Sequence, residues 1–316
     1  MAGRAAVIRL LAGRLVQIGL TLAVLSFAMF LLIGLMPGDP IDLAIAGDPR
    51  LTAEDAARLR ALHGLDQPLL SRYCAWVAAL LRGEFGYSRL FAQPVARIIG
   101  PALASTLLLL GAAVAVSATV GLALGALAAM RPRFAPVTDA VAIVGQSAPS
   151  FWLGILLIIV FAVTLGWLPA GGAAEAGGVE TLRFLVLPVA TLAVANLAGY
   201  ARHSAAELSA VLQSPWITAA RARGVGEMRL LLRHAAPNAA VPVLQVAALD
   251  AGSLVGGALI TETLFARPGM GKLIYDAVMG NDTNLALVAL LLVALVTMCA
   301  TLAADVGQRA LDPRLA

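Results

Sequence analysis

The sequence has little charge, few cysteines and few aromatic residues, and each shortage excludes a class of protein. Only 13% of the 316 residues are charged and 60% are hydrophobic, which is far from the composition of a water-soluble domain. The two cysteines, Cys74 and Cys299, lie in a polar loop and in an apolar run, so they indicate neither a disulfide framework nor a metal site. Basic residues are scattered, and aromatics make up 5%, so nucleic acid is not an expected partner.

The single lysine, Lys272, excludes the usual phosphate-binding loop of an ATPase. That loop needs a spaced glycine-rich turn before the lysine and a Ser or Thr after it. Gly271-Lys272-Leu273 has neither feature. No His-Glu-x-x-His or Ser/His/Asp pattern emerges at plausible membrane positions either. The chain is therefore predicted to have no catalytic residue and no cofactor of its own, so any ATP-driven motion requires another subunit.

Long apolar runs are what the sequence has in abundance. A membrane-spanning helix needs roughly 20 mostly apolar residues. The first run is uncharged from Leu15 to Gly38 and lacks a small-x-small cleavage site, so we expect a retained helix rather than a signal peptide. The fold class is predicted to be an all-α membrane protein with about six transmembrane helices. They are expected at residues 13–36, 102–129, 137–167, 184–204, 239–263 and 284–306.

Arginines at the ends of the runs predict the orientation. They precede the first run, fill the short connection after the second, crowd the connection after the fourth and follow the sixth. Because cytoplasmic loops carry an excess of Lys and Arg, both termini are expected in the cytoplasm. Three regions follow: 1–36 with the first helix, an external (periplasmic) loop at 37–101, and a core at 102–316 that contains a cytoplasmic segment at 214–233.

The external loop is predicted to be helical. Thr52-Ala-Glu-Asp55 resembles a capping box, and Gly64 can end the helix that it starts. A second amphipathic stretch, Ser71–Leu81, follows Pro68. We therefore expect a small helical insertion between the first two membrane helices.

The cytoplasmic segment from Ser214 to Gly224 is the most informative stretch. Ser214 is positioned to cap a helix that starts at Pro215, and Gly224 permits a sharp exit. Small Ala219, Ala220 and Ala222 would let this helix sit closely in the groove of another protein. The composition is equally compatible with an amphipathic helix on the membrane surface, with its arginines near lipid phosphates.

This segment resembles the loop by which importer permeases dock on their ATPase subunits. Ala219-Ala220-x-x-x-Gly224 matches the core of that motif, although Thr218 stands where its commonest form has Glu. Ala219 to Gly224 followed by His234-Ala-Ala-Pro-Asn238-Ala239 is closer to the variant of dipeptide/oligopeptide/nickel permeases. Other short motifs are similar to motifs of this family and occur in the same order. They are Pro37-Gly38-Asp39-Pro40, Leu65-Asp66-Gln67-Pro68, Gly83-Glu84-Phe85-Gly86-Tyr87-Ser88, Pro149-Ser150-Phe151-Trp152-Leu153-Gly154, Gly166-Trp167-Leu168-Pro169, Glu262-Thr263-Leu264-Phe265-Ala266-Arg267-Pro268-Gly269-Met270-Gly271 and Asp312-Pro313-Arg314.

The resemblance implies an ABC importer permease of this binding-protein-dependent family, as a B-type first permease with the type I fold. Its implied partners are a homologous second permease, two ATPase subunits that use ATP and Mg, an external solute-binding protein and the lipid bilayer of a bacterial inner membrane. The implied ATPase-coupling residues are Thr218, Ala219, Ala220, Arg221, Arg223 and Gly224. Peptides are the leading solute class, while nickel chelates, glutathione and sugars stay open.

Polar residues within the apolar runs are candidates for the translocation path. A membrane carboxylate costs about 2.5–3.5 kcal/mol on insertion scales and therefore needs a partner or water. Asp250 is expected to line the path or to form a structural link, and lipid exposure is disfavoured. The family more often has a neutral residue there, so Asp250 is a hypothetical contact for a cationic solute group. Gln245, Ser253 and Asn196 are further candidates.

Glu262, near the outer end of its run, is expected to pair with Arg267 or with a helix end at the outer gate. An ion-coupled secondary transporter that uses Asp250 and Glu262 is the alternative function. That class often has paired broken helices and internal repeats, and neither is visible in the sequence.

Overall fold

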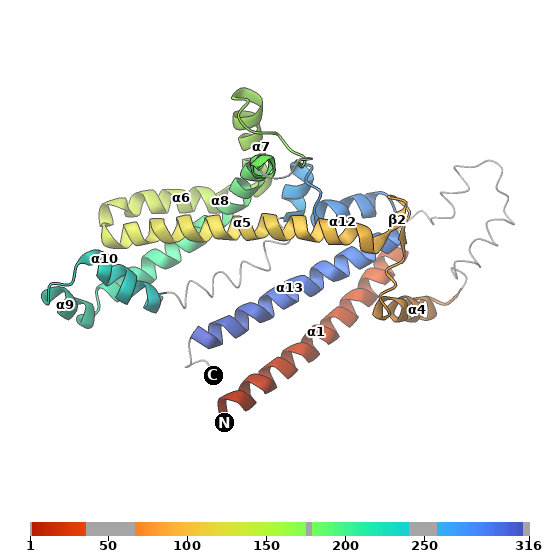
Figure 1. The fold of residues 1–316 in the computed structure, drawn as a ribbon, viewed down its shortest axis with the longest axis horizontal. Helices are drawn as coiled ribbons and strands as arrows, with labels where there is room; N and C mark the ends of the chain where they lie inside the picture. The colour runs from red at the N-terminus through yellow and green to blue at the C-terminus, as the bar shows by residue number, and fades with distance from the viewer. Residues whose placement is uncertain (1, 36–66, 175–178, 240–257, 312–316) are drawn as a thin grey trace. The chain divides into compact units, whose positions relative to one another are not determined.

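The computed structural model describes residues 2–35, 67–174, 179–239 and 258–311, and most of them are helical (Figure 1). They include α1 (Ala2–Gly34), α4 (Leu69–Leu81), β1 (Tyr87–Ser88), β2 (Gln93–Pro94), α5 (Val95–Met130), the 3₁₀ turn η1 (Pro132–Phe134), α6 (Ala135–Ser147), α7 (Ser150–Leu157), the π-helix η2 (Ile158–Thr164), α8 (Val179–Leu212), α9 (Pro215–Ala222), α10 (Glu227–Arg229), the π-helix η3 (Leu230–Ala235), α12 (Met270–Met279) and α13 (Thr283–Leu311). The chain divides into two compact units. Unit 1 is Met1–Leu10, Ala104–Lys272 and Val296–Ala316, and unit 2 is Leu11–Leu103 and Leu273–Leu295.

Four described helices are long and apolar enough to cross a membrane: Ala12–Leu32, Val95–Met130, Glu180–Leu212 and Thr283–Gly307. They coincide with the first, second, fourth and sixth runs of the sequence. The fifth run, 239–263, lies largely outside the described residues. The total of six spans and the cytoplasmic placement of both termini stay predictions.

The third run does not form the continuous helix that the hydropathy of residues 137–167 indicates. Two helical stretches, Pro132–Ser147 and Ser150–Thr164, meet at an angle of 104° and form either a broken span or a re-entrant loop. Pro149 explains the break, because proline offers no N–H to the helix and favours extended backbone in the residue before it. Ala148 accordingly has φ −83° and ψ 125°.

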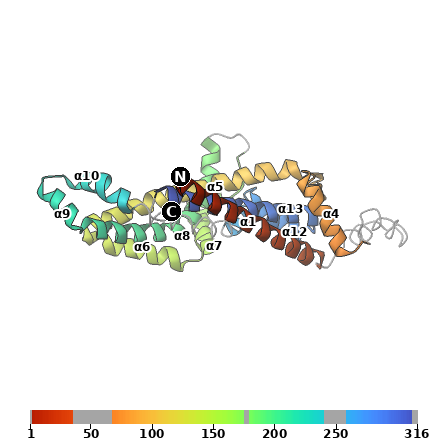
Figure 2. The ribbon, with the colours of Figure 1, turned by 90° about the horizontal axis from the view of Figure 1, so that it is seen from below.

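Helix α8 is the centre of unit 1. Near its start, Leu185, Val189 and Leu192 form a buried apolar cluster with Leu109 and Ala113 of α5. Figures 1 and 2 show α6 running beside α8, and these two helices are in contact. Helix α8 is thus packed against two neighbouring helices, α5 near its start and α6 near its middle.

The contact between α5 and α8 is close because α5 carries glycine at two positions one turn apart. A Cβ atom at Gly121 would lie 2.6 Å from Cβ of Tyr200, and one at Gly125 would lie 2.7 Å from the carbonyl oxygen of Ala201. Small residues four apart let helix backbones approach in this way in membranes. Ser204 of α8 lies at this contact: its hydroxyl donates a 2.6 Å hydrogen bond to the carbonyl of Tyr200 in its own helix and lies 3.4 Å from the carbonyl of Gly121.

In unit 2, α4 packs on the second half of α1. The hydroxyls of Ser26 and Tyr73 are hydrogen-bonded at 2.7 Å, and the Tyr73 ring meets Phe27 and Phe30 edge to face. Helix α4 contains the amphipathic stretch Ser71–Leu81, so the helix predicted there is present. The capping box Thr52–Asp55 lies outside the described residues. The external location of this region stays a prediction.

Candidate functional site

Helix α9 and its flanks form the segment that the sequence indicates for ATPase coupling. The helix begins at Pro215, as predicted, and Ser214 has the extended backbone of an N-cap residue. Its hydroxyl does not cap the helix, however, and instead donates a 2.6 Å hydrogen bond to the carbonyl of Val211. The prediction of a side-chain cap was wrong. The last carbonyls of α8 also lack helical partners, and they compete for the same hydroxyl.

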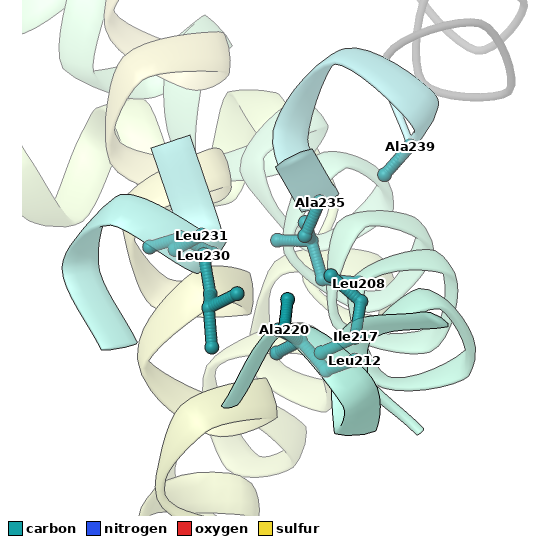
Figure 3. Close-up of a cluster of buried hydrophobic side chains, with 8 residues drawn as sticks. All are labelled: Leu208, Leu212, Ile217, Ala220, Leu230, Leu231, Ala235 and Ala239. Atoms are coloured by element: carbon teal, nitrogen blue, oxygen red, sulfur yellow. The ribbon is translucent and has the colours of Figure 1, made fainter. Parts of the chain in front are cut away.

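One face of α9 is buried against its own chain. Ile217 and Ala220 are 0% and 7% exposed and point into a cluster with residues of α8 and η3. Figure 3 shows the cluster, which consists of Leu208, Leu212, Ile217, Ala220, Leu230, Leu231, Ala235 and Ala239. We call this set the α9 core. It fastens the short helix to the end of α8 by apolar packing, because eight residues are too few for an isolated helix to be stable.

The other face of α9 is exposed. Thr218, Ala219, Arg221, Ala222 and Arg223 all reach the surface. Ala219 and Ala222 are thus exposed, and their role in docking stays a prediction. Ala220 is not, because its methyl group belongs to the α9 core.

An ion pair joins α9 to α10. The Arg221 guanidinium donates to both carboxylate oxygens of Glu227, at 2.5 and 3.0 Å. The hydrogen bond from Arg221 lowers the pKa of Glu227, and the same contact raises the pKa of Arg221. Between these residues Gly224 has φ +86°, which glycine adopts without the strain of a Cβ, so the sharp exit predicted there is confirmed.

The path candidates are only partly within the structure. Asp250, Ser253 and Gln245 lie outside the described residues. Asn196, in α8, is half-buried, and its side-chain nitrogen donates a 2.9 Å hydrogen bond to the carbonyl of Leu192 in the same helix. Its role in the path stays a prediction.

Glu262 is fully buried and binds a helix end. One carboxylate oxygen accepts a 2.6 Å hydrogen bond from the Thr106 hydroxyl, and the other accepts from the backbone N–H groups of Gly271 and Lys272 at 2.7 and 3.3 Å. Thr106 in turn accepts from the N–H of Met270 at 2.7 Å. These N–H groups belong to the first turn of α12, where helical N–H groups lack partners and a negative charge is favourable.

Arg267 lies beside Glu262 without forming a salt bridge to it. Its N–H donates to the Glu262 carbonyl at 2.8 Å, while its side chain is 5% exposed and its Nε has no hydrogen-bond partner. Ion pairs among the described residues include Arg82–Glu84 and Arg221–Glu227. Of the two structural roles predicted for Glu262, the helix end is therefore the one observed.

Sequence reasoning missed Thr106 and Asp282. Asp282, 3% exposed, accepts hydrogen bonds from the Ser88 hydroxyl at 2.6 Å and the Leu90 N–H at 3.0 Å. It also accepts from the N–H of Leu285, which makes it the cap of α13. An aspartate directly before an apolar run was a readable capping signal. Its bond to Ser88, 194 residues away, was not.

The comparison with protein families decides the identity of the chain. Residues 121–316 match the model of the binding-protein-dependent transport system inner membrane component. The chain belongs to this family of permeases. It is accordingly a multi-pass inner-membrane protein and the membrane subunit of an ABC importer.

Curated relatives agree over almost the whole permease. The oligopeptide transport system permease protein AppB of Bacillus subtilis is 31% identical over 92% of this chain and 94% of its own length. A protein described as a peptide transport system permease of Brucella abortus is 35% identical over 92% of this chain and 94% of its own.

Two solved structures of the MetNI methionine ABC transporter, in inward-facing conformations, share the fold. One has a TM-score of 0.55 and 20% identity, covering 69% of this permease and 98% of that chain. The other has a TM-score of 0.52 and 19% identity, covering 66% and 93%. The type I ABC importer permease fold expected from the sequence is thus confirmed.

Proposed function

We propose that this permease forms the translocation path of an ATP-driven peptide importer. The support for peptides is that relatives with 31–35% identity over most of the chain are named as oligopeptide or peptide permeases. Asp250, Ser253, Gln245 and Asn196 are the proposed path residues, and Glu262 with Arg267 the proposed support of an outer gate. The proposed layout keeps both termini in the cytoplasm, with residues 37–101 outside.

The proposed energy source is ATP hydrolysis by partner subunits. A homologous second permease completes the path, two ATPase subunits supply ATP hydrolysis with Mg, and an external binding protein delivers the solute. The observation that carries this proposal is the two-faced α9. Ile217 and Ala220 pack against α8. Ala219 and Ala222 are small and exposed, so another protein can pack closely against this side of the helix.

Replacing Ala222 with Trp tests the docking face. The bulky ring should prevent close seating, so copurification of the ATPase subunits with the permease complex should fall severalfold. Ala206→Trp is the matched control, because Ala206 is exposed on α8 outside the proposed docking segment. Equal loss in both variants, or no ATPase recovered with the wild-type permease, would contradict the coupling role.

Uptake in reconstituted vesicles tests the transport function. Peptide uptake should require the complete complex, the binding protein and ATP together. Uptake by this chain alone, driven by a proton or sodium gradient, would instead support an ion-coupled secondary transporter. The solute retained by the purified binding protein identifies the substrate class, and a non-peptide there would contradict the peptide assignment alone.

A further inference from the structure

We propose that unit 2 contains a binding site for the acyl chain of a phospholipid, in an apolar cavity between α4, α5 and α13. The cavity has a volume of about 360 Å³. Its walls include Leu80 of α4, Ile99 and Gly100 of α5, and Val288 and Leu292 of α13, and every residue that lines it is apolar or glycine. Water would find no hydrogen-bond partners there, whereas cavities of this chemistry take up apolar molecules.

The walls place the cavity within reach of the bilayer. Helices α5 and α13 are both long and apolar enough to cross a membrane, and they supply most of the lining. The cavity residues lie in the first turns of α5 and the first half of α13. Acyl chains are therefore the apolar molecules present at the highest local concentration.

The cavity also opens onto exposed apolar surface. Two of its lining residues, Leu295 of α13 and Phe85, are 38% and 37% exposed. Leu81, next to the lining residue Leu80, is 83% exposed. A chain in the cavity would thus be continuous with apolar surface at its mouth, which is the arrangement expected for a lipid tail entering from the membrane.

The residues beyond α4 suit the level of the lipid headgroups. Tyr87 is 59% exposed, and the side chains of Arg82 and Glu84 are 63% and 64% exposed and form a salt bridge. Tyr is enriched where the hydrocarbon meets the headgroups, and Arg side chains near helix ends extend to that level. Arg82 lies two residues beyond the cavity wall at Leu80, which places a basic side chain, paired with Glu84, close in sequence to that wall.

The form of the cavity suits a lipid tail. A polymethylene chain is thin and flexible, so it can follow an apolar cavity of about 360 Å³ lined by residues of three helices.

Photolabelling of the intact transporter complex tests the site. The complex is reconstituted in phosphatidylethanolamine vesicles that contain a phospholipid with a diazirine in its acyl chain, illuminated, digested and mapped by mass spectrometry. Labels should concentrate on residues 96–100 and 288–295. Gly100→Leu should reduce that labelling severalfold, because a Cβ at Gly100 meets nothing within 4 Å and the side chain can enter the cavity.

Gly111→Leu is the matched control. Gly111 lies in the same helix and also has open space around it, so this variant should keep wild-type labelling. Equal labelling of the cavity in the wild type and in Gly100→Leu would overturn the proposal.

A second measurement decides the question without filling the cavity. The photoreactive amino acid p-benzoylphenylalanine replaces Leu291, which lines the cavity, and the complex is illuminated in the same vesicles. An adduct with the mass of a phospholipid supports the site. A crosslink to the second permease, or to another segment of this chain, shows a protein occupant and overturns it.

Discussion

At the scale of single residues, Glu262 and Thr106 act as one hydrogen-bonding unit. The carboxylate and the hydroxyl together receive the N–H groups of Met270, Gly271 and Lys272. Since these groups begin α12, the pair determines where that helix starts. A buried carboxylate satisfied in this way orders the loop after the fifth apolar run.

Replacing Glu262 with Gln should destabilise the permease. An amide has one acceptor oxygen and one donor nitrogen, so either Thr106 or the N–H groups of α12 would face a donor. A buried donor without a partner costs about 1–3 kcal/mol. Thermal unfolding of the purified complex should show the loss, with Glu180→Gln, an exposed position on α8, as the control. An unchanged unfolding temperature would exclude the role given to Glu262.

The link between Arg221 and Glu227 should be lost in acid. The pKa of Glu227 is lowered from its usual 4.5, so the stabilisation is fully present above that value and disappears as the pH falls through the lowered pKa. Hydrogen exchange of residues 221–229 should therefore be slower in the wild type than in Glu227→Gln at neutral pH. The two proteins should become equal well below pH 4.5. A difference that persists in acid would mean that the ion pair is not its cause.

At the scale of elements, the contact of α5 with α8 depends on glycines of α5, which have no side chain to keep the two helices apart. Gly125→Leu should destabilise unit 1, because the new Cβ would lie 2.7 Å from the Ala201 carbonyl and 2.8 Å from the Ala205 nitrogen. Overpacking of this kind costs typically 1–3 kcal/mol. Gly111→Leu, with open space in the same helix, should unfold like the wild type in a thermal melt. If both variants melt alike, the close approach is not a constraint.

Elements with local signals were predictable from the sequence. Pro215 and Gly224 bound α9 correctly because proline and glycine restrict or free the backbone wherever they stand. The orientation of the Ser214 hydroxyl was not predictable, since two sets of backbone groups compete for it. Hydropathy likewise found the third apolar run but not its 104° bend, because hydropathy measures composition rather than direction.

Contacts between residues far apart in the sequence could not be predicted from it. Glu262 was expected at a gate or a helix end, but its bond to Thr106 crosses 156 residues. The polar pair Ser105-Thr106 within an apolar run was the one available signal, and it names no partner. The inward position of Ala220 also followed only from the packing of α8, α9 and η3.

At the scale of the whole molecule, α8 joins a packed region to the proposed docking helix. The cluster with α5 lies near its start and the α9 core lies at its end. With 34 residues at 1.5 Å each, the helix reaches about 50 Å. A displacement of α9 can therefore reach the early part of α8 if the α9 core stays intact.

Loosening the α9 core should separate ATP hydrolysis from transport. Ile217→Ala removes a fully buried side chain at a cost of about 2–5 kcal/mol, and the exposed face of α9 keeps its residues. Solute uptake per ATP hydrolysed should fall, while copurification of ATPase subunits falls less. Leu232→Ala, which truncates a side chain that is 64% exposed, serves as the control. Proportional losses of uptake and hydrolysis would contradict transmission through this core.

The hydrogen-bond partners of Glu262 are also synthesised at different times. A ribosome makes the chain from its N-terminus, so Thr106 emerges long before Glu262, and Gly271 and Lys272 follow it by only nine and ten residues. Thr106 is thus available to the carboxylate before its backbone partners exist, and the set of hydrogen bonds can be completed only once Lys272 has been made. A nascent chain truncated between Glu262 and Gly271 would have Thr106 but not the N–H groups of α12, and a chain extended past Lys272 would have both.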